Sequence, residues 1–172
     1  MTPNKIIISG KYIRREELPD ESLPPGRILK KFTGIGATTI EIEDKSRNSI
    51  IVCPTKALAA TKAKKHNIFY IGSLYEDVPI ATFKQITEAL NSDELVKVMA
   101  VADSFIGLRI ELGEDINKFF VMYDEIDSFQ SDANYRPNLE ICLDIYFSLD
   151  QDKRAMVSAT LQESADKEIQ SE

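Results

Sequence analysis

Short apolar runs alternate with helix-like stretches along most of the chain. The strand-like runs, rich in β-branched and aromatic residues, are 27–32, 49–53, 68–71, 96–102, 118–123 and 155–158. The stretches between them that suit helices are 37–44, 55–66, 81–91, 104–112 and 137–149. Several strand-like runs are continuously apolar, which is typical of strands buried on both faces. Strands alternating with helices predict βαβ crossovers, so we expect a three-layer α/β/α fold around a mainly parallel sheet.

The two ends of the chain differ from this alternating region. Residues 1–25 are interpreted as an N-terminal lead-in, which contains a β-type run at 5–9 and closes in a Pro-Pro-Gly turn. Residues 26–161 form the expected α/β domain. Residues 162–172 carry four acids and one lysine, and we interpret them as a polar tail or linker stub.

Composition narrows the function classes. A chain of 172 residues suits one compact domain. The net charge of -7 excludes a general positive coating for nucleic acid, although not a local basic face. With Cys53, Cys142 and His66 as the only cysteines and histidine, a Cys/His structural zinc cage is excluded. No apolar stretch approaches the ~20 residues needed to cross a bilayer, so we expect a cytoplasmic protein without a membrane partner.

The first informative segment is TGIGATT at 33–39, between a predicted strand and a predicted helix. Ligands of parallel sheets bind beyond the carboxyl ends of the strands, and two glycines there let backbone N–H groups surround an anion. In the phosphate-binding pattern Gly-x-x-x-x-Gly-Lys-Ser/Thr, aligning Gly36 with the last glycine puts Thr38 at the magnesium-binding hydroxyl. The same alignment puts Ala37 at the lysine and Lys31 at the first glycine. A plain turn with a helix cap is the alternative.

The second segment is VMYDEID at 121–127, a hydrophobic strand that ends in acids. Asp124 followed by Glu125 suits a magnesium ion held through water and an attacking water that a carboxylate orients or deprotonates. The alternative is an acidic helix N-terminus, which the helix dipole favours.

Two further strand ends carry hydroxyl groups. One is MVSAT at 156–160, which by itself is an ordinary capped strand end. The other is VCPTKAL at 52–58, where Thr55 is a candidate N-cap. The predicted helix that follows has five basic residues and no acid: Lys56, Lys62, Lys64, Lys65 and His66. That face is either simply solvated or a contact surface for a phosphate backbone.

In this order, TGIGATT, VCPTKAL, VMYDEID and VSAT resemble motifs I, Ia, II and III of superfamily 2 helicases. VADSF at 101–105 loosely resembles the segment between motifs Ia and II. The resemblance spans roughly residues 27–161. It implies that residues 26–161 are the N-terminal RecA-like domain of a DEAD/DEAH-type helicase, a P-loop NTPase fold with a degenerate Walker A loop.

The resemblance also implies ATP and Mg²⁺ as cofactors and assigns residue roles. The residues that would line the nucleotide phosphates are Gly34, Ile35, Gly36, Ala37, Thr38 and Thr39. Thr38 and Asp124 would hold magnesium, and Glu125 would be the catalytic base beside Asp124. Asp127 would connect to Ser158 and Thr160, which couple nucleotide state to nucleic-acid binding. Pro54, Thr55, Lys56 and the lysines that follow would face a nucleic-acid strand.

Two departures from the family pattern limit the expected activity. Ala37 replaces the lysine that neutralises the β- and γ-phosphates, and losing that charge should severely impair a reaction that depends on positioning and electrostatics. Lys30 or Lys31 is a candidate substitute. No second RecA-like domain with an arginine finger follows residue 161, so we expect a first half of a longer chain, or a relic, with negligible ATP hydrolysis in isolation.

Three functions remain open at this point. The first is the ATP-binding first motor domain of a helicase-like DNA or RNA translocase, which binds nucleic acid weakly by itself and pairs with a second RecA-like domain. The second is a non-catalytic RecA-like interaction module that has lost nucleotide hydrolysis. The third is a small-molecule kinase or another phosphate-binding α/β enzyme, which would leave the Ser-Ala-Thr and Pro-Thr elements unexplained.

Overall fold

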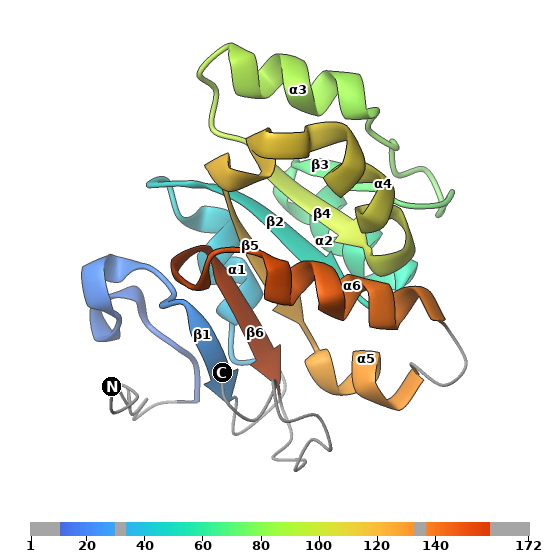
Figure 1. Cartoon of the computed structure of the whole chain (residues 1–172). Helices are drawn as coiled ribbons and strands as arrows, with labels where there is room; N and C mark the ends of the chain where they lie inside the picture. The colour runs from blue at the N-terminus through green and yellow to red at the C-terminus, as the bar shows by residue number, and fades with distance from the viewer. Residues whose placement is uncertain (1–10, 30–33, 133–136, 159–172) are drawn as a thin grey trace.

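A computed structural model describes residues 11–29, 34–132 and 137–158. These residues contain a six-stranded sheet in the order β1-β6-β5-β2-β4-β3, and every adjacent pair of strands is parallel (Figure 1). The strands are β1 (Gly26–Leu29), β2 (Asn48–Cys53), β3 (Phe69–Ile71), β4 (Lys97–Val101), β5 (Phe119–Asp124) and β6 (Arg154–Ser158). Because β6 lies between β1 and β5, the carboxyl ends of these three parallel strands lie side by side.

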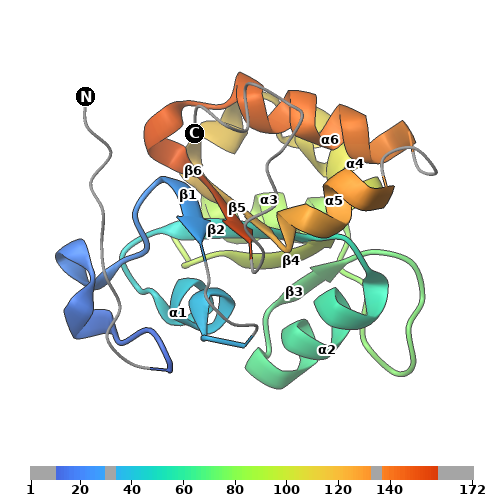
Figure 2. The ribbon, with the colours of Figure 1, turned by 90° about the horizontal axis from the view of Figure 1, so that it is seen from below.

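Helices cover both faces of the sheet, which gives three layers (Figure 2). The α-helices are α1 (Ala37–Glu43), α2 (Lys56–His66), α3 (Phe83–Asn91), α4 (Ala102–Leu112), α5 (Ile126–Asp132) and α6 (Pro137–Ser148). The apolar side chains of α1 and α2 are buried in one hydrophobic cluster, and those of α3 to α6 are buried in the other. The expected three-layer α/β/α class with a parallel sheet is confirmed, and it is consistent with a RecA-like domain.

The central strands explain why continuous apolar runs predicted this sheet. Every residue of β4, β5 and β6 is buried, and so are all residues of β2 after Asn48. Alternate residues of these strands enter opposite clusters; Ile50 faces α3 to α6, whereas Ile51 faces α1 and α2. Burial of each large aliphatic side chain contributes about 1.5–3 kcal/mol, so a strand covered on both faces needs apolar residues at successive positions.

The element boundaries differ from expectation in a few places. The third predicted helix begins at Phe83 because Thr82 caps it: the Thr82 side chain accepts from the Gln85 amide, and the Gln85 side chain accepts from the Thr82 amide. Helix α5 was not among the predicted helix ranges, although a helix start at the acids after β5 was the stated alternative, and Ala102 begins α4 rather than ending a strand. The described chain also contains short 3-10 turns: η1 (Arg15–Glu17), η2 (Pro19–Glu21), η3 (Gly113–Lys118) and η4 (Gln151–Lys153). The β-type run at 5–9, the end of the first predicted strand and the tail at 162–172 lie outside the described residues.

The described part of the N-terminal lead-in packs against the α/β domain. Ile13, Leu18 and Leu23 are buried in the cluster that contains α1 and α2. The Ile13 amide also donates a 2.9 Å hydrogen bond to the Ile35 carbonyl, in the loop that precedes α1. The lead-in therefore supports the glycine loop directly.

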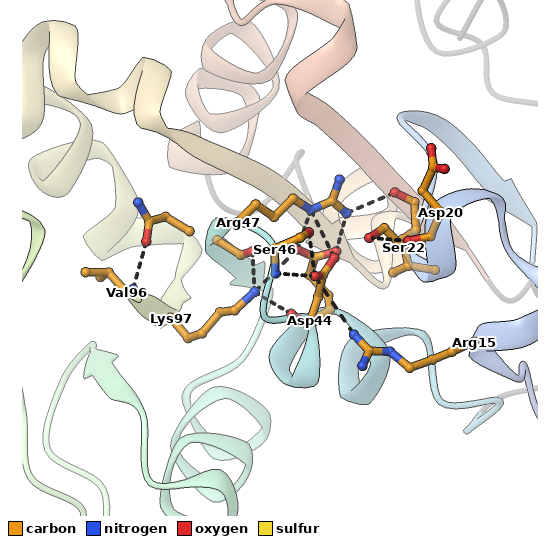
Figure 3. Close-up of polar contacts among 12 residues, drawn as sticks. Arg15, Asp20, Ser22, Asp44, Ser46, Arg47, Val96 and Lys97 are labelled. Carbon is orange, nitrogen blue, oxygen red and sulfur yellow. Dashed lines mark hydrogen bonds and ion pairs between the residues drawn. The ribbon is translucent and has the colours of Figure 1, made fainter. Parts of the chain in front are cut away.

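A buried polar network ties α1 to the amino ends of β2 and β4 (Figure 3). Arg47 holds the fully buried Glu41 carboxylate with two hydrogen bonds of 3.1 and 2.6 Å. The Lys97 ammonium donates to the Glu41 backbone carbonyl at 2.7 Å and to the Ser49 hydroxyl at 2.8 Å. The Arg47 guanidinium also lies 3.4 Å from the Phe120 ring centroid. This network fixes the carboxyl end of α1, at the opposite end of the sheet from the segments that resemble helicase motifs.

Two groups of this network have shifted pKa values. Burial alone would raise the pKa of Asp44, but hydrogen bonds from Ser46 and Ser22 and the charge of Arg47 lower it to about 2. Burial lowers the pKa of Lys97 to about 8, against the opposing charges of Glu41 and Asp44. The folded protein therefore favours an ionised Asp44 and disfavours a protonated Lys97 relative to water.

Candidate functional site

The carboxyl ends of the parallel strands lie at one edge of the sheet, where ligand sites of such sheets form. The glycine loop follows β1, Asp124 ends β5 and Ser158 ends β6, while residues 54–56 follow β2. This arrangement places the described residues of all four predicted motif segments at the same edge.

The glycine loop owes its conformation to Gly34 and Gly36. Their φ angles are 76° and 96°, in the left-handed region that side chains other than glycine rarely adopt. Apart from the adjacent chain positions, no atom of the described residues lies within 4 Å of a Cβ built at either glycine, so backbone conformation rather than space requires glycine. Gly36 is the N-cap of α1, and Ala37 is its first residue, with only 2% of its surface exposed. Ile35 is also buried, whereas Thr39 is half-buried.

Thr38 and Asp124 meet directly, although 86 positions separate them in the sequence. The Thr38 hydroxyl donates a 2.5 Å hydrogen bond to Oδ2 of Asp124. The two side chains are 5% and 1% exposed. The structure therefore brings together the two residues that the sequence assigned to one magnesium ion.

Lys62 joins this pair from α2. Its ammonium donates to the Thr38 hydroxyl at 2.8 Å and to Oδ2 of Asp124 at 2.9 Å. The Lys62 side chain is 27% exposed, so the ammonium lies at the boundary between the buried pair and solvent. Ala59 and Ala63, the small residues beside it on the helix, are buried against the sheet. This contact corrects the expectation that every lysine of α2 belongs to one solvated or phosphate-binding face.

Glu125 has a left-handed backbone between β5 and α5, with φ of 59°. The other described non-glycine residues with positive φ are Asp20, Glu21, Asn67, Glu76 and Asp93, and all of them are exposed. Glu125 is instead half-buried. Backbone strain of this kind costs about 1–3 kcal/mol and is typical of functional sites.

Asp127 lies in the first turn of α5 and accepts a 2.6 Å hydrogen bond from the Ser158 hydroxyl at the end of β6. The structure thus joins two of the three predicted coupling residues, and Thr160 lies outside the described residues. The acidic helix start that the sequence left open is present as well, because Asp127 occupies the first turn of a real helix.

Packing behind Asp124 holds the end of β5 in place. Tyr123 is fully buried and donates a 2.5 Å hydrogen bond to the Cys142 carbonyl in α6. Its ring lies 5.2 Å from that of Phe129 in α5, in a stacked arrangement. Burial raises the pKa of Tyr123 well above its usual value, so its hydroxyl stays a donor. Nothing in the sequence pattern predicted this hydrogen bond between β5 and α6.

The predicted nucleic-acid residues have different environments. Thr55 and Lys56 are exposed at the start of α2, whereas Pro54 is buried. Thr55 occupies the N-cap position, but its side chain makes no capping hydrogen bond, which corrects the expected cap. Lys64, farther along α2, pairs with Asp77 at 2.5 Å. None of these contacts involves Thr38 or Asp124. Lys30 and Lys31, the candidate substitutes for the missing lysine, lie outside the described residues.

A hollow of about 740 Å³ lies away from this edge, beside the carboxyl end of α2 and the amino end of β4. His66, Tyr70 and Lys97 are among the residues that line it. Burial lowers the pKa of His66, and the charges of Lys65 and Lys62 act in the same direction. Lys64, one of the lysines expected to face nucleic acid, also lines this hollow, whereas the residues assigned to nucleotide, magnesium and coupling are not among its lining residues.

Comparison with known proteins adds no identification. The sequence matches no protein-family model, and the curated proteins include no match to it. Over the described ranges, no helix has both the length and the apolar character needed to cross a membrane.

Proposed function

We propose that the chain is the ATP-binding first motor domain of a helicase-like DNA or RNA translocase, with little or no ATPase activity by itself. The observation that carries the proposal is the 2.5 Å hydrogen bond between Thr38 and Asp124. These residues come from the segments that resemble motifs I and II, and a shared fold alone would not require them to touch.

The side-chain oxygen atoms of Thr38 and Asp124 suit Mg²⁺ as ligands. A hydroxyl oxygen and a carboxylate oxygen are hard ligands of the kind that this ion takes, and Mg²⁺ commonly completes its shell with waters and substrate phosphates. When bound, Mg²⁺ would neutralise charge on the nucleotide phosphates. Thr38 and Asp124 are the residues that would hold it.

The surrounding residues support the same assignment. Glu125 follows Asp124 with a strained backbone, which suits a carboxylate held for a specific task such as orienting water. The Ser158–Asp127 hydrogen bond connects the segments that resemble motifs III and II. A change in the position of Asp124 would therefore be transmitted through Asp127 to Ser158, at the end of β6.

Nucleic acid would bind at the start of α2. Thr55 and Lys56 are exposed there, at the same edge of the sheet as the proposed nucleotide site. The net charge of -7 opposes strong binding to a polyanion, so the second RecA-like domain would supply much of the affinity.

Calorimetric titration of Mg·ATP tests the proposal. The matched variants are Asp124→Asn and Asp93→Asn, which each remove one negative charge; Asp93 is exposed in the loop before β4. We expect wild type and Asp93→Asn to bind and Asp124→Asn to lose binding. Circular dichroism would check that each variant is folded. Absence of wild-type binding at millimolar ATP, or equal binding by both variants, would contradict the proposal.

A non-catalytic interaction module remains the second candidate, and Ala37 is the observation that favours it. A buried methyl group stands where nucleotide-hydrolysing relatives need an ammonium group. Such a module would retain the fold and the Thr38–Asp124 contact without binding nucleotide. A titration that shows no heat with Mg·ATP, for wild type and for Ala37→Lys alike, would support this candidate.

A further inference from the structure

We infer that Lys62 supplies, from α2, the positive charge that Ala37 leaves out of the glycine loop. This inference rests on the proposed nucleotide site. Its starting point is the position of the Lys62 ammonium, 2.8 Å from the Thr38 hydroxyl and 2.9 Å from Oδ2 of Asp124. A cation therefore already contacts both of the residues that would bind the metal–phosphate group.

The glycine loop cannot provide that charge at its usual position. Ala37 is the first residue of α1, is 2% exposed and ends in a methyl group. A phosphate chain brought to Thr38 would meet hydroxyl and amide donors there but no ammonium from position 37. Lys62 is a compact point charge on a flexible four-carbon stem, which suits it to follow a phosphate oxygen.

The Lys62 side chain is accessible from solvent. Its side chain is 27% exposed, so the ammonium can exchange its bond to Asp124 for one to a ligand without crossing the core. The neighbouring alanines of α2 pack closely against the sheet and hold the helix backbone near the site. By contrast, Lys64 pairs with Asp77, and Lys65 is exposed.

The same geometry allows an opposite role, which the experiment must separate. If the Lys62 ammonium only occupied the position of the divalent cation and competed with it, removing the ammonium would strengthen Mg·ATP binding. If it supplies charge to the phosphates, removing it would weaken binding. The sign of the effect therefore decides between the two.

The test measures Mg·ATP, Mg·ADP and AMP binding by calorimetry for wild type and three variants. Lys62→Gln removes the charge, Lys62→Arg keeps a cation, and Lys65→Gln is the control on the same helix. We expect Lys62→Gln to weaken ATP and ADP binding by about tenfold or more, the loss typical of a charge-assisted hydrogen bond. AMP, which lacks the β- and γ-phosphates, should bind with unchanged affinity. Lys62→Arg should retain most of the affinity, and Lys65→Gln should match wild type.

A double variant strengthens the test. The double variant Lys62→Gln/Ala37→Lys removes the positive charge from α2 and adds one in the glycine loop. It should recover ATP binding. Because position 37 is buried, thermal unfolding must first show that this variant is folded; the three single-site variants decide the question if it is not.

The outcomes separate the inference from the proposed function. If wild type binds ATP and Lys62→Gln binds equally or more tightly, the inference is overturned while the nucleotide site stands. If wild type does not bind ATP but the single variant Ala37→Lys does, Lys62 does not replace the missing charge. The inference about Lys62 and the proposed ATP binding then both fail for the natural chain. If neither binds, the proposed function fails, and the inference fails with it.

Discussion

The Ser158 hydroxyl donates a 2.6 Å hydrogen bond to Oδ1 of Asp127. Ser158 is the last residue of β6, and Asp127 lies in the first turn of α5, directly after the Asp-Glu pair. Strand β6 pairs with β1 on one side and with β5 on the other. The bond therefore joins β6 to α5, the helix that follows Asp124 at the end of β5. It adds a side-chain connection between the segments that resemble motifs II and III, whose strands β5 and β6 also pair directly.

Replacing Ser158 with alanine should lower the free energy of unfolding by about 2 kcal/mol, because a buried hydroxyl that donates to a carboxylate is lost. Urea denaturation measures the change. Ser148→Ala is the matched control, since the Ser148 hydroxyl is exposed and bonds only to a carbonyl at the end of its own helix. Equal losses for the two variants would show that the bond to Asp127 contributes nothing particular.

Replacing Glu125 with glycine should stabilise the protein by about 1 kcal/mol, because glycine adopts the left-handed backbone without strain. The same change should remove the proposed catalytic base. Glu88→Gly, in the middle of α3, is the control and should instead destabilise by about 1 kcal/mol. Denaturation midpoints that fall in both variants would mean that the backbone at Glu125 carries no strain.

Stability should depend on pH through Lys97. Its pKa is lowered from 10.5 to about 8 by burial, so the unfolded chain binds more protons than the folded protein between these values. The contribution of Lys97 is therefore unfavourable below pH 8, and the free energy of unfolding should rise across this window by an amount on the order of 3 kcal/mol. Lys97→Met keeps the length of the side chain without the charge.

The difference between wild type and Lys97→Met isolates this group from the other lysines and tyrosines that titrate at alkaline pH. Urea denaturation at several pH values should show a steeper rise for wild type. Parallel curves for the two proteins would mean that Lys97 is protonated equally easily in the folded and unfolded states.

Binding to single-stranded nucleic acid should depend on Lys56. Lys56→Ala should weaken binding at low salt and reduce the slope of log affinity against log salt by about 0.7–1, the value for one phosphate contact. Fluorescence anisotropy with a labelled oligonucleotide measures both quantities. Lys84→Ala is the control, since Lys84 is an exposed lysine of α3, on the other face of the sheet. Equal losses for the two variants would indicate diffuse attraction rather than a contact surface on α2.

The sheet could be predicted because its signal is local. Continuous apolar runs such as residues 49–53 and 118–123 belong to strands covered on both faces, and each predicted run overlaps an observed strand. Helix α5 was left as an alternative because Ile126–Asp132 is short and polar, and its acids fitted a magnesium site as well as a helix start. The Glu41–Arg47–Lys97 network was also missed, since charged residues at strand and helix ends normally indicate solvent.

The candidate site could be predicted in part for the same reason. Asp124 and Ser158 end strands, Thr38 and Asp127 lie in the first turns of helices that follow strands, and parallel strands bring their carboxyl ends to one edge. Lys62 lies in the middle of a helix, and its direction depends on how α2 packs beside α1. The only sequence signal was its position between Ala59 and Ala63, which marks the buried side of the helix.

The central claim is that nucleotide binds at the edge of the sheet where Thr38 meets Asp124. Hydrogen–deuterium exchange with and without a slowly hydrolysed Mg·ATP analogue tests it at the level of peptides. We predict slower amide exchange in residues 34–43 and 124–129 and unchanged exchange in α3. Unchanged exchange throughout, or protection confined to the hollow around His66 and Tyr70, would contradict the claim.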